Sequence, residues 1–164
     1  MLLCGCLPFL RVIMDETDLL ALQLLARHGR MTWAELAGHL ALSNPAAAER
    51  VRRLEERGAI LGYGAIVHRE SVDYGLTAFV DVDLADNSKR AAFLKRVASM
   101  PEVLECHHVT GDHDFLIKIV CRNPKHLDAL LNEQLKHGNT VARTRTTIVL
   151  GSPKEVLFIP PDTV

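Results

Sequence analysis

The chain has 164 residues, of which 48% are hydrophobic, so it can bury a core and is not expected to be disordered. Its formal net charge of -1 excludes a general polycation, so any binding of nucleic acid would depend on a local group of basic residues. Four cysteines do not make a disulfide scaffold in a chain of this length, and no apolar run reaches the roughly 18 residues of a membrane span. These features predict a cytoplasmic protein of one or two small domains.

The first thirteen residues are apolar but do not resemble a signal peptide. No basic residue precedes the apolar stretch, and no small-residue cleavage site follows it. Cys4 and Cys6 have no second pair of ligands nearby, which makes a metal site there weak. We therefore predict that residues 1–13 are an unstructured or misannotated extension and that organised structure begins at Met14.

Three short helices are predicted between residues 14 and 57. Leucines recur at helical spacing over 18–28, and Thr32 with Glu35 matches a capping box at the start of the next helix. Ser43 is an N-cap candidate for a third helix from about residue 44 to 57. The short turn before this third helix is typical of a helix-turn-helix.

The apolar and glycine-rich run 59–67 predicts an extended wing or linker strand after the third helix. We assign residues 14–62 to a winged helix-turn-helix DNA-binding domain and residues 63–76 to a linker strand and connection.

The third helix carries the candidate DNA contacts. Ala47, Val51 and Leu54 share one face and are expected in the core, which turns the basic residues outward. In a recognition helix the N-terminal half enters the major groove, where small residues allow close approach and arginines reach guanine edges or phosphates. The candidate DNA-binding residues are Ser43, Asn44, Ala46, Ala48, Glu49, Arg50, Arg52 and Arg53. Charge alone favours a solvated face of Glu–Arg pairs, whereas the helix-turn-helix context favours DNA.

The hydrophobic period changes from helical to alternating near residue 77. Strands are predicted at 77–84, 103–110, 113–121, 141–150 and 156–159, with amphipathic helices before 103 and after 123. The order βαββαβ plus a tail strand predicts a ferredoxin-like sheet with helices on one face. We assign residues 77–164 to this domain, so the predicted fold class is α+β.

The strand at 115–121 is apolar on both faces. Phe115, Ile117 and Ile119 alternate with a second set that includes Leu116 and Val120. A face that met only water would not carry both of these residues, so we expect a homodimer that forms through this sheet.

Several segments of the chain resemble the Lrp/AsnC family of transcription regulators. They are LSNPAAAERVRRLE (42–55), GAILGY (58–63), ECHHVTGDHDF (105–115) and TRTTIVL (144–150). The resemblance covers about residues 15–150. It implies a DNA-binding regulator that dimerises, often builds octamers or other dimer assemblies, and binds an amino acid between effector domains.

Two positions depart from the family pattern. The proline at the start of the recognition helix stands one place later, at Pro45. Thr140 occupies a position where the family usually has a glycine before the last strand, and Gly138 precedes it by two residues.

The predicted hairpin at 110–114 is the candidate effector site. Gly111 can adopt a positive φ and bring backbone N–H groups to a ligand carboxylate, while Asp112 and Asp114 can bind an ammonium group. The resemblance points to the same hairpin and adds hydroxyls of the last strand. The candidate effector-binding residues are Thr110, Gly111, Asp112, His113, Asp114, Thr144 and Thr146. The alternative is a tight turn in which an aspartate caps neighbouring N–H groups.

Two rival functions fit parts of the sequence. A metal-responsive regulator would use His107, His108 and His113, but strand alternation places His107 and His108 on opposite faces. A ligand-binding module would retain only a degenerate helix-turn-helix. The sequence has no glycine-rich phosphate loop and no Ser/His/Asp set with a recognisable spacing. We therefore expect no enzyme, no catalytic residues and no metal or other cofactor.

Overall fold

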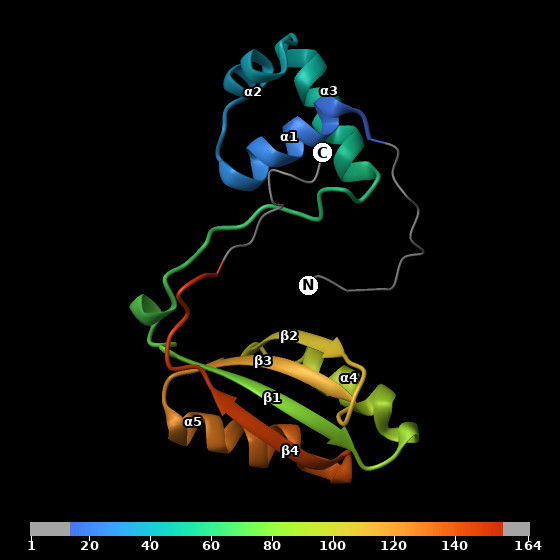
Figure 1. Ribbon diagram of the computed structural model, residues 1–164, viewed down its shortest axis with the longest axis vertical. Coiled ribbons are helices and arrows are strands. Elements are labelled where there is room, and N and C mark those ends of the chain that lie inside the picture. Colours follow the sequence, from blue (N-terminus) through green and yellow to red (C-terminus); the bar gives the residue numbers. More distant parts are fainter. Residues whose placement is uncertain (1–13, 156–164) are drawn as a thin grey trace. The chain divides into compact units, whose positions relative to one another are not determined.

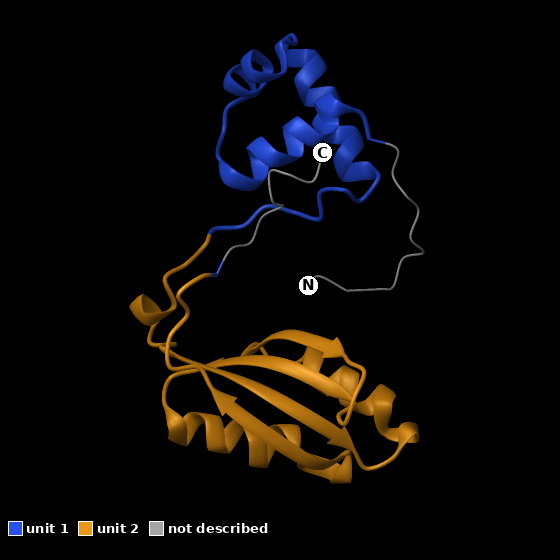
Figure 2. Ribbon diagram, in the orientation of Figure 1, with its two compact units in different colours: residues 1–65, 155–164 blue, residues 66–154 orange. Residues whose placement is uncertain are grey.

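Figure 1 shows a computed structural model of the protein, which describes residues 14–155. The described chain forms two compact units (Figure 2): the N-terminal unit holds residues up to Ala65 together with Glu155, and the C-terminal unit holds Ile66–Lys154. The predicted extension 1–13 and the predicted tail strand 156–159 lie outside the described residues. Within the described part, no helix is both long enough and apolar enough to cross a membrane.

The N-terminal unit is the predicted three-helix arrangement. Its helices are α1 (Glu16–Arg27), α2 (Trp33–Leu40) and α3 (Asn44–Glu56). Thr32 and Glu35 form the predicted capping box of α2, because each side chain accepts a hydrogen bond from the other residue's backbone N–H. The Ser43 hydroxyl accepts the N–H of Ala46 and caps α3, as predicted.

Among the described residues, eight buried apolar side chains form the core of the N-terminal unit. They are Ala21, Leu22, Leu36, Ala37, Leu40, Ala47, Val51 and Leu54. The last three confirm the predicted inner face of α3. Gly58, with φ of 71°, follows the end of α3 in the left-handed conformation that favours glycine.

The linker was predicted as a strand, and this prediction was wrong. Residues 61–68 form neither a helix nor a strand in the described structure. No neighbouring strand of the described chain pairs with their N–H and C=O groups, so the run stays unpaired in spite of its apolar character.

The C-terminal unit is a four-stranded antiparallel sheet in the order β2-β3-β1-β4. The strands are β1 (Leu76–Leu84), β2 (Val103–His108), β3 (Phe115–Cys121) and β4 (Val141–Ile148). The helices are α4 (Arg90–Ala98) and α5 (Pro124–Ala129), and α5 continues as a π-helical segment, Leu130–Leu135. Short 3-10 turns occupy Arg69–Val72, Asn87–Lys89 and His137–Asn139. This is the predicted βαββαβ fold.

One face of the sheet, here called the inner face, packs against the helices. Val80 of β1 and Ile117 of β3 are fully buried there with Phe93 of α4 and Leu130. The opposite, outer face has a mixed character. Its Val120 is only 6% exposed within the single chain, so its burial does not require a partner.

The two strands of the hairpin are shorter than predicted. β2 ends at His108, β3 begins at Phe115, and residues 109–114 form the loop between them. Asp114 explains the difference, because its backbone N–H binds the Val82 carbonyl at 3.0 Å and its carboxylate accepts the Leu84 N–H at 2.7 Å. These bonds direct Asp114 to the end of β1. Gly111 has φ of 114°, the positive value that its position was predicted to use.

Thr140 has a structural role in the turn before β4. Its side chain is 2% exposed, and its hydroxyl accepts a hydrogen bond from Arg96 Nη1 at 2.5 Å. The same Arg96 nitrogen also donates to the carbonyls of Leu135 and His137. Gly138 and Asn139 supply the positive φ values of the turn, at 75° and 51°, and Thr140 has φ of -82°, so residue 140 needs no glycine.

We expect Thr140→Gly to lower the free energy of unfolding by about 1–3 kcal/mol, because a charge-assisted hydrogen bond is lost from a buried site. Urea denaturation of the full chain measures the effect. Thr140→Ser is the control, because it retains the hydroxyl and should lose less. Equal stability of Thr140→Gly and the parent would contradict this role.

Candidate functional sites

The solvent-facing side of α3 carries a ladder of exposed ion pairs. The carboxylate of Glu49 accepts from Arg52 Nη2 at 2.7 Å and from Arg53 Nε at 3.0 Å. Arg52 also binds Glu56. The hydrogen bonds from Arg52 and Arg53 lower the pKa of Glu49 to about 2, so this carboxylate is charged at neutral pH. Exposed pairs of this kind are weak and can exchange partners.

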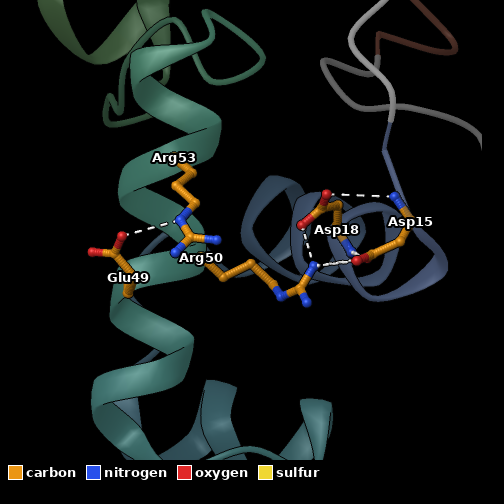
Figure 3. Close-up of polar contacts among 5 residues, drawn as sticks. All are labelled: Asp15, Asp18, Glu49, Arg50 and Arg53. Atoms are coloured by element: carbon orange, nitrogen blue, oxygen red, sulfur yellow. Dashed lines mark hydrogen bonds and ion pairs between the residues drawn. The ribbon is translucent and has the colours of Figure 1, made fainter.

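Arg50 differs from Arg52 and Arg53, and Figure 3 shows the contrast with Arg53. Its Nη1 atom lies 2.7 Å from both carboxylate oxygens of Asp15 and 2.5 Å from Oδ1 of Asp18, at the start of α1. Hydrogen bonding to Arg50 is the main cause that lowers the pKa of Asp15. The side chain of Arg50 is 28% exposed, against 55% for Arg52 and 60% for Arg53. The structure therefore separates three arginines that the sequence analysis had grouped.

The first turn of α3 is exposed and small. Ser43, Asn44 and Ala46 are exposed, and Ala48 is half-buried. A hollow of about 440 Å³ lies between α3 and the start of α1, and its lining includes Ala46, Arg50 and Arg53 together with Asp15 and Asp18. The surface thus combines short side chains at its N-terminal end with guanidinium groups one to two turns later, which suits contact with a groove and its flanking phosphates.

The C-terminal unit has a second hollow, of about 540 Å³. Its lining residues are Asp112, His113, Arg143 and Arg145, and we call it the charged hollow. Two of these lining residues share one partner, because Asp83 accepts from His113 Nδ1 at 2.8 Å and from Arg143 Nε at 2.8 Å. Hydrogen bonding to His113, followed by Arg143, lowers the pKa of Asp83. By contrast, neither Asp112 nor Arg145 forms an ion pair or hydrogen bond with any residue that the structure describes.

The charged hollow contains only part of the predicted effector set. Asp112 and His113 line it, and Thr110 and Gly111 precede them in the same exposed loop. The carboxylate of Asp114 is occupied by the Leu84 N–H.

Thr144 and Thr146 pair in register with Val82 and Val80, which places them on the inner face of the sheet, away from the charged hollow. Arg143 and Arg145 were missed by the sequence analysis. Their alternation with these threonines along β4 was the signal that could have located them on the outer face.

The histidines of the metal hypothesis are separated. His107 lies near Glu105, at 3.3 Å, whereas His108 lies near Arg90, at 3.2 Å. His113 is bound to Asp83. Among residues 14–155, no three His, Cys, Asp or Glu side chains are grouped as metal ligands.

Comparison with known proteins matches both units. Residues 14–60 match the family model of winged helix-turn-helix DNA-binding domains, and residues 77–156 match that of the Lrp/AsnC ligand binding domain. An HTH-type transcriptional regulator of Bacillus subtilis is 37% identical over 85% of this chain and 95% of its own length. The leucine-responsive regulatory protein of Rhizobium meliloti is 36% identical over 88% and 94%. A solved transcriptional regulator of Neisseria meningitidis, in complex with L-Met, has a TM-score of 0.86 at 30% identity, covering 92% and 98%.

Asp83 provides a test of the hollow's electrostatics. Because its pKa is lowered in the folded state, its stabilising effect is present above the ordinary carboxyl pKa and is lost as the pH falls through the lowered value. Asp83→Asn should therefore melt below the parent at neutral pH, and the gap should close in acid. Thermal unfolding between about pH 7 and pH 3 measures it, with Asp112→Asn as the control. A gap that is constant with pH would refute the assignment.

Proposed function

The chain belongs to the Lrp/AsnC family of transcription regulators, and we propose that it binds duplex DNA through α3 and responds to an amino acid in the charged hollow. The observation that carries the DNA part is the exposed pair of Arg52 and Arg53 beyond a small-residue first turn. We infer that the chain is a binding protein and not an enzyme. We also infer that it works in the cytoplasm, where its DNA is.

DNA phosphates can replace Glu49 as the hydrogen-bond acceptor of Arg52 and Arg53. In the free protein, Glu49 neutralises part of the charge of Arg52 and Arg53 through exposed bonds. A phosphate can accept from the same guanidinium donors, and the release of counterions from DNA favours the exchange. Because few basic side chains take part in each subunit, affinity should fall with salt along a shallow slope.

Replacement of both Arg52 and Arg53 by Ala tests α3 as the recognition helix. We expect weaker binding to a DNA duplex and a decrease in the salt slope of roughly one for each arginine per subunit. Fluorescence anisotropy at several salt concentrations measures both quantities. Arg30→Ala removes an exposed arginine outside α3 and is the matched control. If the double variant binds like the parent, α3 is not the DNA-binding surface.

The charged hollow has the chemistry to hold a zwitterion. Arg145 presents a guanidinium group for a ligand carboxylate, and Asp112 presents a carboxylate for a ligand ammonium group. Both groups are without described partners, whereas Asp83 is already held by His113 and Arg143. An α-amino acid carries both complementary charges. We therefore place the effector between Asp112 and Arg145, with the 110–113 loop beside it.

Calorimetry with each of the twenty amino acids tests this placement. At least one should bind the parent, and Asp112→Ala or Arg145→Ala should abolish that binding while light scattering shows unchanged assembly. Thr146→Val is the matched control on the inner face of β4 and should bind like the parent. Loss of binding in the control alone would move the site to the inner face, and binding of no amino acid would reject it.

A second copy of the chain is a further proposed partner. Phe79 and Leu104 are apolar side chains that are 36% and 48% exposed on the C-terminal unit. Burial of such residues favours association, so we infer a homodimer and larger assemblies of dimers. Two recognition helices per dimer would then read two half-sites of one DNA duplex.

A further inference from the structure

Arg50 is the binding partner of a buried carboxylate. Asp18 is 7% exposed and is one of two buried polar residues in the described chain. An ionised carboxylate at such a position is stable only with hydrogen bonds and a compensating positive charge. Arg50 is the cation that binds it, at 2.5 Å.

Asp15 adds a second carboxylate beside Asp18, which strengthens the need for a compensating positive charge. It is the N-cap of α1, and its Oδ1 accepts the Asp18 N–H at 2.7 Å while Asp18 Oδ2 lies 3.4 Å from the Asp15 N–H. The two carboxylates are therefore held close together by the capping box itself. Removal of the guanidinium from between them would leave two adjacent like charges, one of them buried.

The position of Arg50 in α3 gives the ion pair a function. Arg50 lies next to the buried Val51, and Glu49, on its other side, binds Arg53 on the outer surface. The same turn of α3 thus points one arginine at α1 and supports another on the exposed side (Figure 3). A bond between α1 and α3 at this level restricts the rotation and sliding of α3.

We propose that Arg50 is a positioning residue: it fixes α3 on α1 through Asp15 and Asp18 and makes no phosphate contact, so the phosphate contacts of α3 come from Arg52 and Arg53. The proposal rests on the proposed function of α3. An arginine that bound phosphate would have to leave two carboxylates uncompensated, whereas Arg52 and Arg53 give up only exposed partners.

Salt dependence of DNA binding separates the two roles, because only residues that neutralise phosphates contribute to the slope. The full chain is titrated with a mixed-sequence duplex several helical turns long, between about 50 and 200 mM salt. Arg50→Met should bind more weakly, on the order of tenfold, with the slope of the parent. Arg53→Met should lower the slope by about one per subunit. A decrease of that size in Arg50→Met would overturn the proposal.

Unfolding measurements test the bond to α1 independently of DNA. Arg50→Met alone should lower the melting temperature of the full chain, because it leaves the carboxylate of Asp18 uncompensated. Adding Asp18→Asn should recover part of the loss, because the buried charge is then removed. If Arg50→Met is poorly folded, the double variant takes its place in the salt titration. Additive effects of the two substitutions would also overturn the proposal.

The two experiments distinguish failure of the proposed function of α3 from failure of the positioning role of Arg50. If Arg53→Met and the Arg52/Arg53 double variant both keep the parental slope and affinity, α3 is not the DNA-binding surface and the proposed function fails. The coupling between Arg50 and Asp18 then still decides whether Arg50 positions α3. If Arg53→Met lowers the slope and Arg50→Met does so equally, only the positioning role is rejected.

Discussion

The N-terminal unit has a thin core, and the compensation of one buried carboxylate at the edge of that core constrains how its helices meet. Three of the eight buried apolar residues of its described part are alanines, so few large side chains interdigitate to fix the orientation of the helices. Asp18 is buried beside this core and binds an arginine of α3. Because an unpaired charge there would be costly, α3 is favoured in the position that brings Arg50 to Asp18. What α3 presents to a partner follows from that position.

Arginines within one turn of α3 thereby acquire different roles, and burial of the partner decides which role each has. Asp18 is nearly excluded from water, so its bond to Arg50 is costly to break. Glu49 is 40% exposed, so water can replace it as the partner of Arg53 at little cost. In the free protein the outer charges of α3 are thus partly neutralised. On the proposed function, such a surface should bind scattered anions weakly and respond to an ordered row of phosphates.

Local features were predictable from the sequence, and long-range pairings were not. The cap at Thr32 and the alternation along β1 depend on residues within a few positions of one another, and both were predicted correctly. Arg50 and Asp15 are 35 positions apart, and nothing in the spacing of the sequence connects them. The loop at Asp114 is similar, because its bond to Leu84 spans 30 positions and shortens the predicted strands. Residues 61–68 had a strand-like composition but no neighbouring strand to pair with.

The charged hollow and the outer side of α3 carry different sets of charges, so binding at the two sites should respond differently to salt. Asp83 already accepts hydrogen bonds from His113 and Arg143, so the proposed ligand would meet one group of each sign without a described partner, Asp112 and Arg145. A ligand with equal and opposite charges matches this pair without changing the net charge of the unit. Its binding should release few counterions and should depend little on salt, whereas the proposed binding of phosphates by α3 should weaken as salt rises. On this proposal, the affinity for a zwitterion should stay nearly constant while the affinity for DNA varies with ionic strength.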